Sequence, residues 1–386
     1  MANVYAKKPL IIVKGKGAIV WDIDGKEYID CMSGYGVVLV GHSNPQVIEA
    51  INKQVEKLIT FHGSFYNDLR AGLVKKIVEI APEELNRVFF SNSGAEAVEA
   101  AIKLARKYTG KKEIIAMVRG FHGKTMGALS ATWNEKYKKG FEPLLPGFKH
   151  VPYGRAEKVR EAITDQTAAV IVEPVQGEGG VYIPPDDYLP ALRELCTEKN
   201  VLLIVDEVQT GLGRTGKMFA CQHWNVNPDV MCLAKGIASG IPMGATMTKE
   251  EIMACLGIGE HTTTLGGNAL ACAAASATID YIINEKLPER AAATGKYFKD
   301  ELDTLGRKYK LVREVRGLGL MLGMELRFEV RDILFKALDH GVIILDAGRN
   351  VLRFLPPLII EKPQVDKVVS VLDKLLAEEE HVKIRS

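Results

Sequence analysis

Two short apolar segments in the second half of the chain each end at a charged side chain. Residues 201–205 run into Asp206, and residues 230–234 run into Lys235. In α/β proteins, ligands bind beyond the carboxyl ends of the strands, where this carboxylate and this amine would lie. Pyridoxal phosphate catalysis requires a carboxylate that keeps a pyridine nitrogen protonated and a lysine that forms a Schiff base. The pair therefore predicts a pyridoxal-phosphate site.

Taken singly, each residue has a simpler explanation. Lys235 alone would be a surface lysine, and Asp206 alone would be a turn residue that ends a strand. Their shared context favours catalysis, because a lysine at the end of a buried strand and beside Gly236 loses hydration. Desolvation lowers the pKa of an amine and frees it for imine formation. We therefore expect Lys235 and Asp206 to form the catalytic pair.

A candidate anion site follows an earlier apolar strand. Ser93, Gly94 and Ala95 stand between residues 87–90 and an alanine-rich helical segment. Unpaired backbone N–H groups and the positive end of the helix dipole converge at such a helix start, so a phosphate would fit there. A serine that only caps the helix is the simpler alternative.

The segment Phe-His-Gly-Lys-Thr follows another predicted strand at the same edge of the sheet. Phe121 could stack on a flat cofactor ring, with the basic Lys124 close by. A buried Phe beside a histidine satisfied in the core, here His122, is the commoner outcome for such a segment.

Arg353 lies among apolar residues, where an unpaired guanidinium would be costly. We expect a carboxylate partner, either from substrate or, in its absence, from Glu178 in the loop 173–180, for which a solvated turn is the simpler explanation. The hydroxyl- and glycine-rich stretch 261–268, which contains Thr264, offers a second anion contact ahead of an alanine-rich helix.

Residues 211–216 match the dinucleotide pattern GxGxxG, and with Lys217 and Met218 they nearly match a Walker A loop. Met218 stands where a nucleotide site needs Ser or Thr to hold magnesium. The segment after it reaches Asn227-Pro too soon for the helix that a dinucleotide loop opens. We therefore reject nucleotide binding, and neither Cys nor His spacing predicts a metal site.

The elements that would position these residues follow an α/β pattern. Short apolar strands at 87–90, 113–118, 168–172, 201–205 and 230–234 alternate with helical stretches, which predicts a mainly parallel sheet covered on both faces. Before them, residues 17–22 and 26–30 flank Asp24-Gly25 as a predicted hairpin. Asn44-Pro45 should then begin a helix whose stripe Val47, Ile51, Val55 and Leu58 packs on a core.

We divide the chain into three regions. Residues 1–50 are an N-terminal segment that contributes to a small domain, residues 51–280 form the large cofactor-binding domain, and residues 281–386 form the C-terminal small domain. The last region contains predicted short strands at 317–325 and 342–345 among charged amphipathic helices.

Composition narrows the function classes. With 386 residues, 47% hydrophobic and 25% charged, and a formal net charge of +2, the chain has no general basic field for nucleic acid or membrane. Six scattered cysteines, a four-residue apolar run after the first lysines and no apolar run long enough to span a bilayer predict a cytoplasmic protein.

With these motifs in this order, the chain resembles the class III, or ω-amino acid, branch of fold-type I aminotransferases. The match runs from the hairpin WDIDGKEYID to RFLPP and includes SNSGAEAVEAAIKLAR, FHGKT, EPVQGEGG, DEVQTGLGRTG, AKG and TTLGGN. Within the branch it is most similar to the acetylornithine and ornithine aminotransferases, including relatives that act on amino acids attached to an amino-group carrier protein. The resemblance implies a large domain with a seven-stranded, mainly parallel sheet and a smaller α+β domain.

The resemblance also implies a role for each candidate residue. Lys235 would carry the cofactor and move the proton, Asp206 would hold the ring nitrogen, and Gln209 would lie near the ring hydroxyl. Thr264 would reach the phosphate from the neighbouring subunit of a homodimer. The implied cofactor-binding set is Ser93, Gly94, Ala95, Phe121, His122, Asp206, Gln209, Lys235 and Thr264.

The implied substrates are an ω-amino acid and glutamate or 2-oxoglutarate, whose α-carboxylate Arg353 would grip while Glu178 pairs with it for the ω-amino substrate. Lys124 stands where many members have Arg to hold the far carboxylate, and Tyr35 matches the ornithine-type members. We expect transfer of the terminal amino group of N-acetylornithine, or of a carrier-linked ornithine or lysine, in arginine or lysine biosynthesis. Ornithine, 4-aminobutyrate or another ω-amino acid is the alternative substrate. A non-catalytic cofactor- or carrier-binding protein is the competing class.

Overall fold

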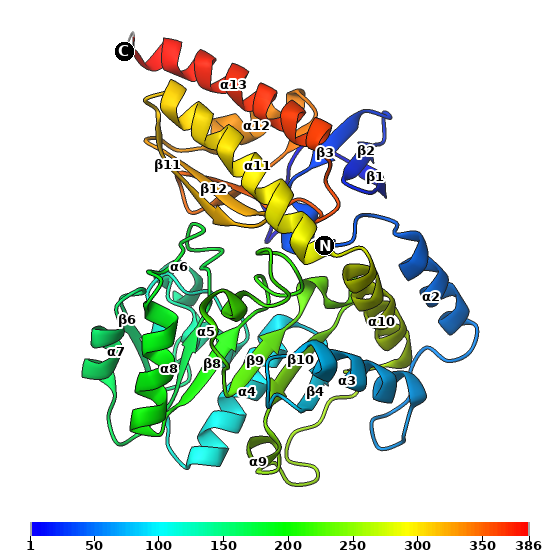
Figure 1. Ribbon diagram of the computed structural model, residues 1–386, viewed down its shortest axis with the longest axis vertical. Coiled ribbons are helices and arrows are strands. Elements are labelled where there is room, and N and C mark those ends of the chain that lie inside the picture. Colours follow the sequence, from blue (N-terminus) through cyan, green and yellow to red (C-terminus); the bar gives the residue numbers. More distant parts are fainter. Residues whose placement is uncertain (1, 385–386) are drawn as a thin grey trace.

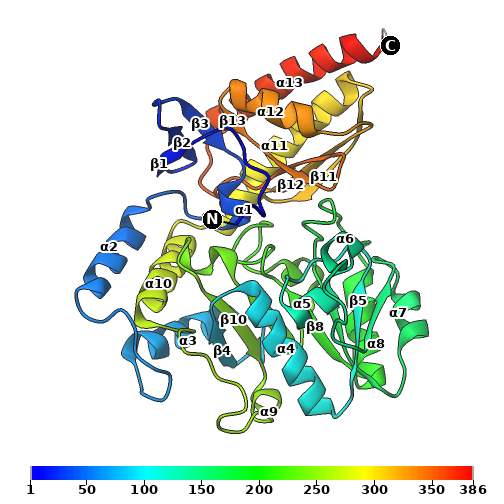
Figure 2. The same cartoon turned by 180° about the vertical axis from the view of Figure 1, so that it is seen from behind.

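The computed structural model describes residues 2–384. Its elements form two lobes, which Figures 1 and 2 show from opposite sides. The lower lobe in these views is built on a seven-stranded sheet, and the upper lobe holds two four-stranded sheets. The long helix α11 (Leu287–Lys308) begins near the boundary between the lobes and runs into the upper one.

The large sheet is mainly parallel, as predicted. Its strands lie in the spatial order β4 (Arg87–Ser91), β10 (Gly244–Thr248), β9 (Val230–Leu233), β8 (Leu202–Asp206), β7 (Thr167–Val172), β5 (Glu113–Met117) and β6 (Phe148–Val151). The strands from β9 to β6 are parallel, and β10 runs antiparallel to both of its neighbours. The predicted strands agree with the structure to within one residue at each end. β6 and β10 were not predicted, because FKHV is half polar and GATMT begins at a glycine.

Helices cover both faces of this sheet. Ile204 of β8 packs in one apolar cluster with Ile102 of α4 (Gly94–Thr109). Val205, the next residue, points to the other face and belongs to the cluster that contains Leu192 of α8 (Tyr188–Lys199). In Figure 1 α8 lies in front of the sheet, and in Figure 2 α4 does. Full burial of each such side chain contributes about 1.5–3 kcal/mol, so the strand ends are held on a rigid support.

The remaining helical segments of the lower lobe are mostly short. They are α2 (Pro45–Val55), α3 (Asp68–Ile80), α5 (Met126–Ala131), α6 (Glu135–Lys138), α7 (Ala156–Ala162), α9 (Glu250–Met253), α10 (Ala269–Asn284) and the 3₁₀ turns η1 (Ala220–Trp224) and η2 (Lys235–Ala238).

The upper lobe joins the two ends of the chain. One sheet contains β1 (Ile12–Lys16), β2 (Ile19–Asp22), β3 (Glu27–Asp30) and β13 (Val342–Ile343), and the other contains β11 (Val312–Leu318), β12 (Met321–Leu326), β15 (Val351–Phe354) and β14 (Leu345–Ala347). The helices are α12 (Arg331–Asp339) and α13 (Lys362–Ile384), with the short α1 (Ser33–Gly36) near the boundary. The predicted domain limits stay a prediction, and their last two residues lie outside the described part of the chain.

The predicted hairpin is confirmed. β2 and β3 pair antiparallel, and Gly25 takes a φ of +82° in the turn between them. One carboxylate oxygen of Asp22 accepts hydrogen bonds from the backbone N–H groups of Asp24 and Lys26, which closes the turn. β3 also pairs in parallel with β13, so the N-terminal strands share a sheet with the C-terminal part of the chain.

The predicted apolar stripe of α2 is only partly buried. The side chain of Asn44 caps the helix as expected, and Val47 is buried. Val55 and Leu58, however, are 45% and 38% exposed, so the prediction that the whole stripe packs on a core is wrong. The helix ends at Val55, which takes Leu58 off the helical repeat.

The strands predicted near the C-terminus also differ from the structure. Residues 317–325 are not one strand, because a turn at Gly319, with φ of +53°, folds β11 back onto β12. Residues 342–345 are divided between two sheets, since β13 pairs with β3 and β14 with β15. A continuous apolar run carries no signal for either change of direction. Among residues 2–384, no helix is long and apolar enough to cross a membrane.

Candidate active site

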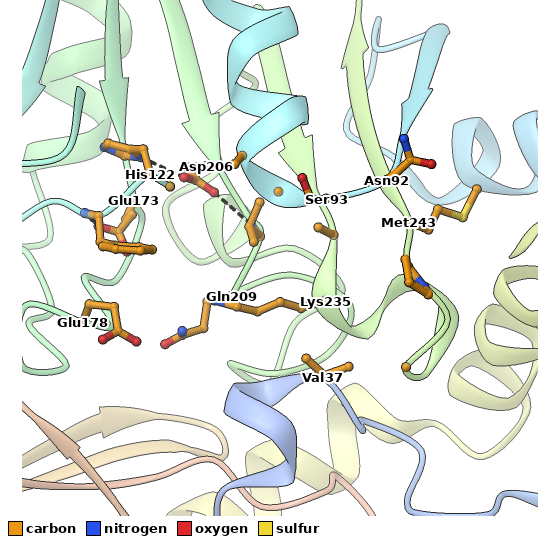
Figure 3. Close-up of a pocket in the computed structure, with 18 of the residues that line it drawn as sticks. Val37, Asn92, Ser93, His122, Glu173, Glu178, Asp206, Gln209, Lys235 and Met243 are labelled. Carbon is orange, nitrogen blue, oxygen red and sulfur yellow. Dashed lines mark hydrogen bonds and ion pairs between the residues drawn. The ribbon is translucent and has the colours of Figure 1, made fainter. Parts of the chain in front are cut away.

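Lys235 and Asp206 line the same cavity at the carboxyl ends of the central strands. Asp206 ends β8 and pairs in register with Cys232 of β9, and Lys235 begins the turn that follows β9. The cavity has a volume of about 390 Å³. Figure 3 shows the Lys235 side chain between Asp206 on one side and Val37 on the other. The structure thus brings the two predicted catalytic residues together.

Asp206 is held by two hydrogen bonds. Its Oδ2 lies 2.7 Å from Nδ1 of His122, and its Oδ1 accepts a bond of 3.0 Å from the backbone N–H of Val208. Burial acts to lower the pKa of His122, but the hydrogen bond to Asp206 and the charge of Asp206 outweigh this effect and raise the pKa above its ordinary value. The imidazole therefore presents an N–H to the carboxylate and orients it toward the cavity.

Lys235 is partly buried and lines the cavity. Burial lowers the pKa of Lys235, against the opposing effect of Glu178. The backbone of Lys235 has a φ of +45°, and a non-glycine residue occupies this left-handed region at a cost of about 1 kcal/mol or more. The next residue needs to be glycine, because a Cβ on Gly236 would lie 2.1 Å from Leu39. This tight turn fixes a largely desolvated amine, as the sequence predicted.

The predicted anion site lies at the start of α4. The hydroxyl of Ser93 caps the helix by accepting the backbone N–H of Glu96, so the simpler interpretation holds for this oxygen. The N–H groups of Gly94 and Ala95 belong to the first turn and have no acceptor among the described residues. A Cβ on Gly94 would lie 2.8 Å from Val208, so this glycine permits the start of α4 to lie close to the segment that follows β8. Ser93, Gly94 and Ala95 all line the cavity.

Arg353 is fully buried and paired with Glu178. The Nη1 atom of Arg353 lies 2.8 Å from Oε1 of Glu178 and 3.4 Å from Oε1 of Gln209. Burial works to raise the pKa of Glu178, but Arg353 and Lys235 together lower it below its ordinary value. Nε and Nη2 of Arg353 have no partner among the described residues. The predicted carboxylate partner is therefore present, and it uses only one of the donor atoms of Arg353.

Tyr35 and Lys124 do not line the main cavity. Tyr35 is 48% exposed and lines an adjoining hollow together with Phe121, Tyr137 and Glu178. Phe121 also lines the main cavity, so it stands where the two spaces meet. Lys124 is exposed, with its Nζ 4.6 Å from the centre of the Tyr137 ring. These residues surround an approach to the cavity rather than its floor.

One predicted cofactor residue lies elsewhere within this chain. Thr264 is exposed and does not line the cavity. Its predicted contact requires a neighbouring subunit and stays a prediction.

Glu173 was underestimated from the sequence. The sequence indicates a strand-end loop with two carboxylates, for which a solvated turn is the simpler explanation, and it assigns Glu173 no role. In the structure Glu173 is buried, lines the cavity and accepts the backbone N–H groups of Phe121 and Gly177. Burial raises the pKa of Glu173 to about 7. The missed signal is its place directly after the fully buried β7, which is similar to the place of Asp206 as the last residue of β8. Val37 and Met243 also line the cavity, and no sequence pattern indicated them.

The GxGxxG segment forms a loop that contacts the upper lobe. Arg214 within it is fully buried and donates to the backbone carbonyls of Leu320 and Pro356 in the upper lobe. Only the short turn η1 follows. Among residues 2–384, no group of three His, Cys, Asp or Glu side chains could hold a metal ion.

The residues present fit pyridoxal phosphate. The volume of the cavity lies within the range of about 300–1,000 Å³ that small-molecule sites occupy. A carboxylate has about four acceptor positions, so Asp206 can accept a ring N–H besides its two present bonds. The unpaired N–H groups of Gly94 and Ala95 suit a phosphate, and Lys235 supplies the amine.

Comparison with known proteins agrees with this site. The model of the family Aminotransferase class-III matches residues 1–376. An acetylornithine aminotransferase of Methanocaldococcus jannaschii is 50% identical over 382 residues, which cover 97% of this chain and 96% of that protein.

Solved structures show the same fold. The ornithine aminotransferase of Toxoplasma gondii, in a crystal with partial occupancy of pyridoxal phosphate at its active site, superposes with a TM-score of 0.94 at 36% identity, over 98% of this chain and 93% of that one. The acetylornithine aminotransferase of Elizabethkingia anophelis gives a TM-score of 0.86 at 35% identity, over 98% and 96%. The match to the family, the fold and the cavity lead to the same conclusion. The chain belongs to the class-III aminotransferases, which are pyridoxal-phosphate-dependent transaminases.

Proposed function

We propose that the protein transfers the terminal amino group of N-acetylornithine to 2-oxoglutarate, giving N-acetylglutamate semialdehyde and glutamate. The observation that carries the proposal is the shared cavity of Lys235 and Asp206, which Glu178 also lines while paired with the buried Arg353. The choice of donor is supported by the curated relatives, which are acetylornithine aminotransferases and favour this substrate over ornithine or 4-aminobutyrate.

Each of these residues has a separate role in the reaction. When bound, pyridoxal phosphate supplies an aldehyde that condenses with amines and a ring that accepts the electron pair left by a departing proton. Asp206 keeps the ring nitrogen protonated, and the start of α4 binds the phosphate. The Nζ of Lys235, whose pKa is lowered by burial, takes the proton from the amine-bearing carbon of the donor and returns one to the keto carbon of the acceptor.

Arg353 and Glu178 accommodate two different substrates. The reacting carbon of N-acetylornithine carries no carboxylate, so Glu178 keeps the charge of Arg353 neutralised while the donor is bound. 2-Oxoglutarate carries a carboxylate next to its reacting carbon, and this group takes the free donors of Arg353 in place of Glu178. Lys124 and Tyr35, at the approach to the cavity, hold the far carboxylate of the donor.

Three further features belong to the same proposal. The enzyme works as a homodimer in which Thr264 of one subunit reaches the phosphate in the other. Its donor is free N-acetylornithine, with an ornithine or lysine linked to an amino-group carrier protein as the alternative. It acts in the cytoplasm.

The test is turnover by the purified enzyme loaded with pyridoxal phosphate. With 2-oxoglutarate as acceptor, glutamate formation should have a higher kcat/KM with N-acetylornithine than with ornithine or 4-aminobutyrate. The Lys235→Ala variant should form no glutamate with any donor. A preference for ornithine or 4-aminobutyrate would refute the proposed donor, and turnover by Lys235→Ala would refute the catalytic assignment.

A further inference from the structure

A row of residues across an upper-lobe sheet faces the loop that carries Glu178. Arg316 of β11 pairs in register with Gly323 of β12, and Gly323 pairs in register with Arg353 of β15. Residues that pair directly on neighbouring strands point to the same face of the sheet. Gly323 leaves room in the middle of this row, since a Cβ there would lie 3.1 Å from the side chain of Val181. The loop therefore rests on the sheet across three strands.

The loop is short and closed. Gln176 and Tyr182 pair through two backbone hydrogen bonds, and residues 177–181 form the turn between them. Gly180, with a φ of +126°, allows Arg316 of the sheet to approach, because a Cβ on it would lie 3.3 Å from Nη2 of Arg316 and 2.8 Å from the Tyr182 ring. Within it, the N–H groups of Gly180 and Val181 both donate to the carbonyl of Gly177, so a contact at Gly180 restrains the residues between, including Glu178.

Arg316 grips this turn at one carbonyl group. Its Nε and Nη2 atoms both donate to the backbone oxygen of Gly180, at 3.0 and 2.8 Å. Its Nη1 donates to Glu325 at 2.8 Å, and both side chains of this pair are buried. The guanidinium also lies 4.2 Å from the centre of the Tyr182 ring, whose surroundings include Arg119 at 4.5 Å. The ion pair with Glu325 thus holds the Arg316 guanidinium in place independently of its bonds to the loop.

The two arginines of the row act on the same turn in different ways. Arg353 pairs with the Glu178 side chain, and Arg316 holds the backbone two residues farther on. Glu178 lines the cavity and Arg353 does not, so a substrate carboxylate can reach Arg353 only after Glu178 gives way. The energy needed to move Glu178 is therefore subtracted from the binding energy of the substrate carboxylate.

We propose that Arg316 is a positioning residue that holds Glu178 against Arg353 and so sets how strongly the site favours a donor without a carboxylate on its reacting carbon over 2-oxoglutarate. The inference rests on the proposed function, because it deepens the account of the two substrates. If Arg316 is lost, Glu178 moves away more easily. 2-Oxoglutarate then binds more tightly, and the donor binds less well beside an arginine that is no longer neutralised.

Arg316→Met tests this, with Arg313→Met as a matched control. Arg313 lies on the same strand and bonds to the same Glu325, but it is 65% exposed and does not touch the loop. Arg316→Met should lower KM for 2-oxoglutarate about threefold to tenfold and raise KM for N-acetylornithine, whereas Arg313→Met should change neither. Equal losses in both half-reactions, or an unchanged KM for 2-oxoglutarate, would overturn the proposal.

A second substitution separates positioning from general damage. In a Glu178→Gln background, Arg316→Met should no longer change KM for 2-oxoglutarate, because no carboxylate is left to position. The same decrease in both backgrounds would overturn the proposal. If Arg316→Met does not fold, Arg316→Lys, which keeps the charge near Glu325 but cannot place two donors on one carbonyl, should lower the same KM by a smaller factor.

Hydrogen exchange gives a readout that needs no turnover. In the apoprotein, the amides of residues 180–182 should exchange faster in Arg316→Met than in the unsubstituted protein or in Arg313→Met. Unchanged exchange would overturn the proposal. If the unsubstituted enzyme does not act on N-acetylornithine, the proposed function fails, while exchange and the half-reaction with glutamate still decide the role of Arg316.

Discussion

Replacing Arg353 with Met should weaken 2-oxoglutarate binding far more than donor binding. Nη1 of Arg353 bonds to Glu178, and Nε and Nη2 have no partner among the described residues. An incoming carboxylate gains two charge-assisted bonds and displaces one. The net gain is therefore about one such bond, or roughly 1.5–3 kcal/mol. At 1.4 kcal/mol for each factor of ten, KM for 2-oxoglutarate should rise about tenfold to a hundredfold.

The assay measures the two half-reactions separately. Enzyme in its two cofactor forms is mixed in a stopped-flow instrument with N-acetylornithine or with 2-oxoglutarate, and the absorbance of the bound cofactor is followed. The donor half-reaction of Arg353→Met should stay within about threefold of the unsubstituted enzyme, and Arg313→Met should match that enzyme in both. Equal losses in the two half-reactions would refute the reasoning, because they would mean that Arg353 supports the fold of the site and not one substrate.

Three further predictions concern the cofactor. His122→Phe removes the bond to Asp206 and should weaken pyridoxal phosphate binding about tenfold in equilibrium titration, while His223→Phe, remote from the cavity, should not. Burial lowers the pKa of Lys235, so the rate of cofactor uptake by the apoprotein should rise with pH and level off below the pH at which an exposed lysine loses its proton. A rate that still rises at the pH where an exposed lysine titrates would contradict the assignment of Lys235 as the reacting amine. The third prediction uses mixed dimers in which one chain carries Lys235→Ala, so that only the site with an intact Lys235 works. Thr264→Ala should weaken cofactor binding at this working site when it lies on the same chain as Lys235→Ala, and should have no effect when it lies on the other chain. The reverse result would place Thr264 in its own subunit's site.

Much of the catalytic centre could be predicted because its signals are local. Strands buried on both faces are continuous apolar runs, so the ends of β8 and β9 could be located, and with them Asp206 and Lys235. Glu173 was undervalued because a carboxylate after such a strand looks the same whether the loop beyond it is buried or solvated.

Other features depend on contacts between distant segments. The register that aligns Arg316, Gly323 and Arg353 is a property of three strands together, and no spacing in the sequence indicates it. The turn at Gly319 lies inside a continuous apolar run, and the division of residues 342–345 between two sheets depends on which strand each part meets. The exposure of Val55 likewise depends on which segments pack against the end of α2, and the apolar periodicity of the helix does not indicate those segments.

The pairing of β3 (Glu27–Asp30) with β13 (Val342–Ile343) has a consequence for synthesis of the chain on the ribosome. The edge of β3 that accepts β13 stays open until roughly 300 further residues have been added, which takes about 15–60 s at typical elongation rates of 5–20 residues per second. During that time the N-terminal hairpin presents unpaired backbone groups, which other chains could pair with. The lower lobe can begin to fold in this interval, whereas the upper lobe is completed only when the C-terminal strands emerge.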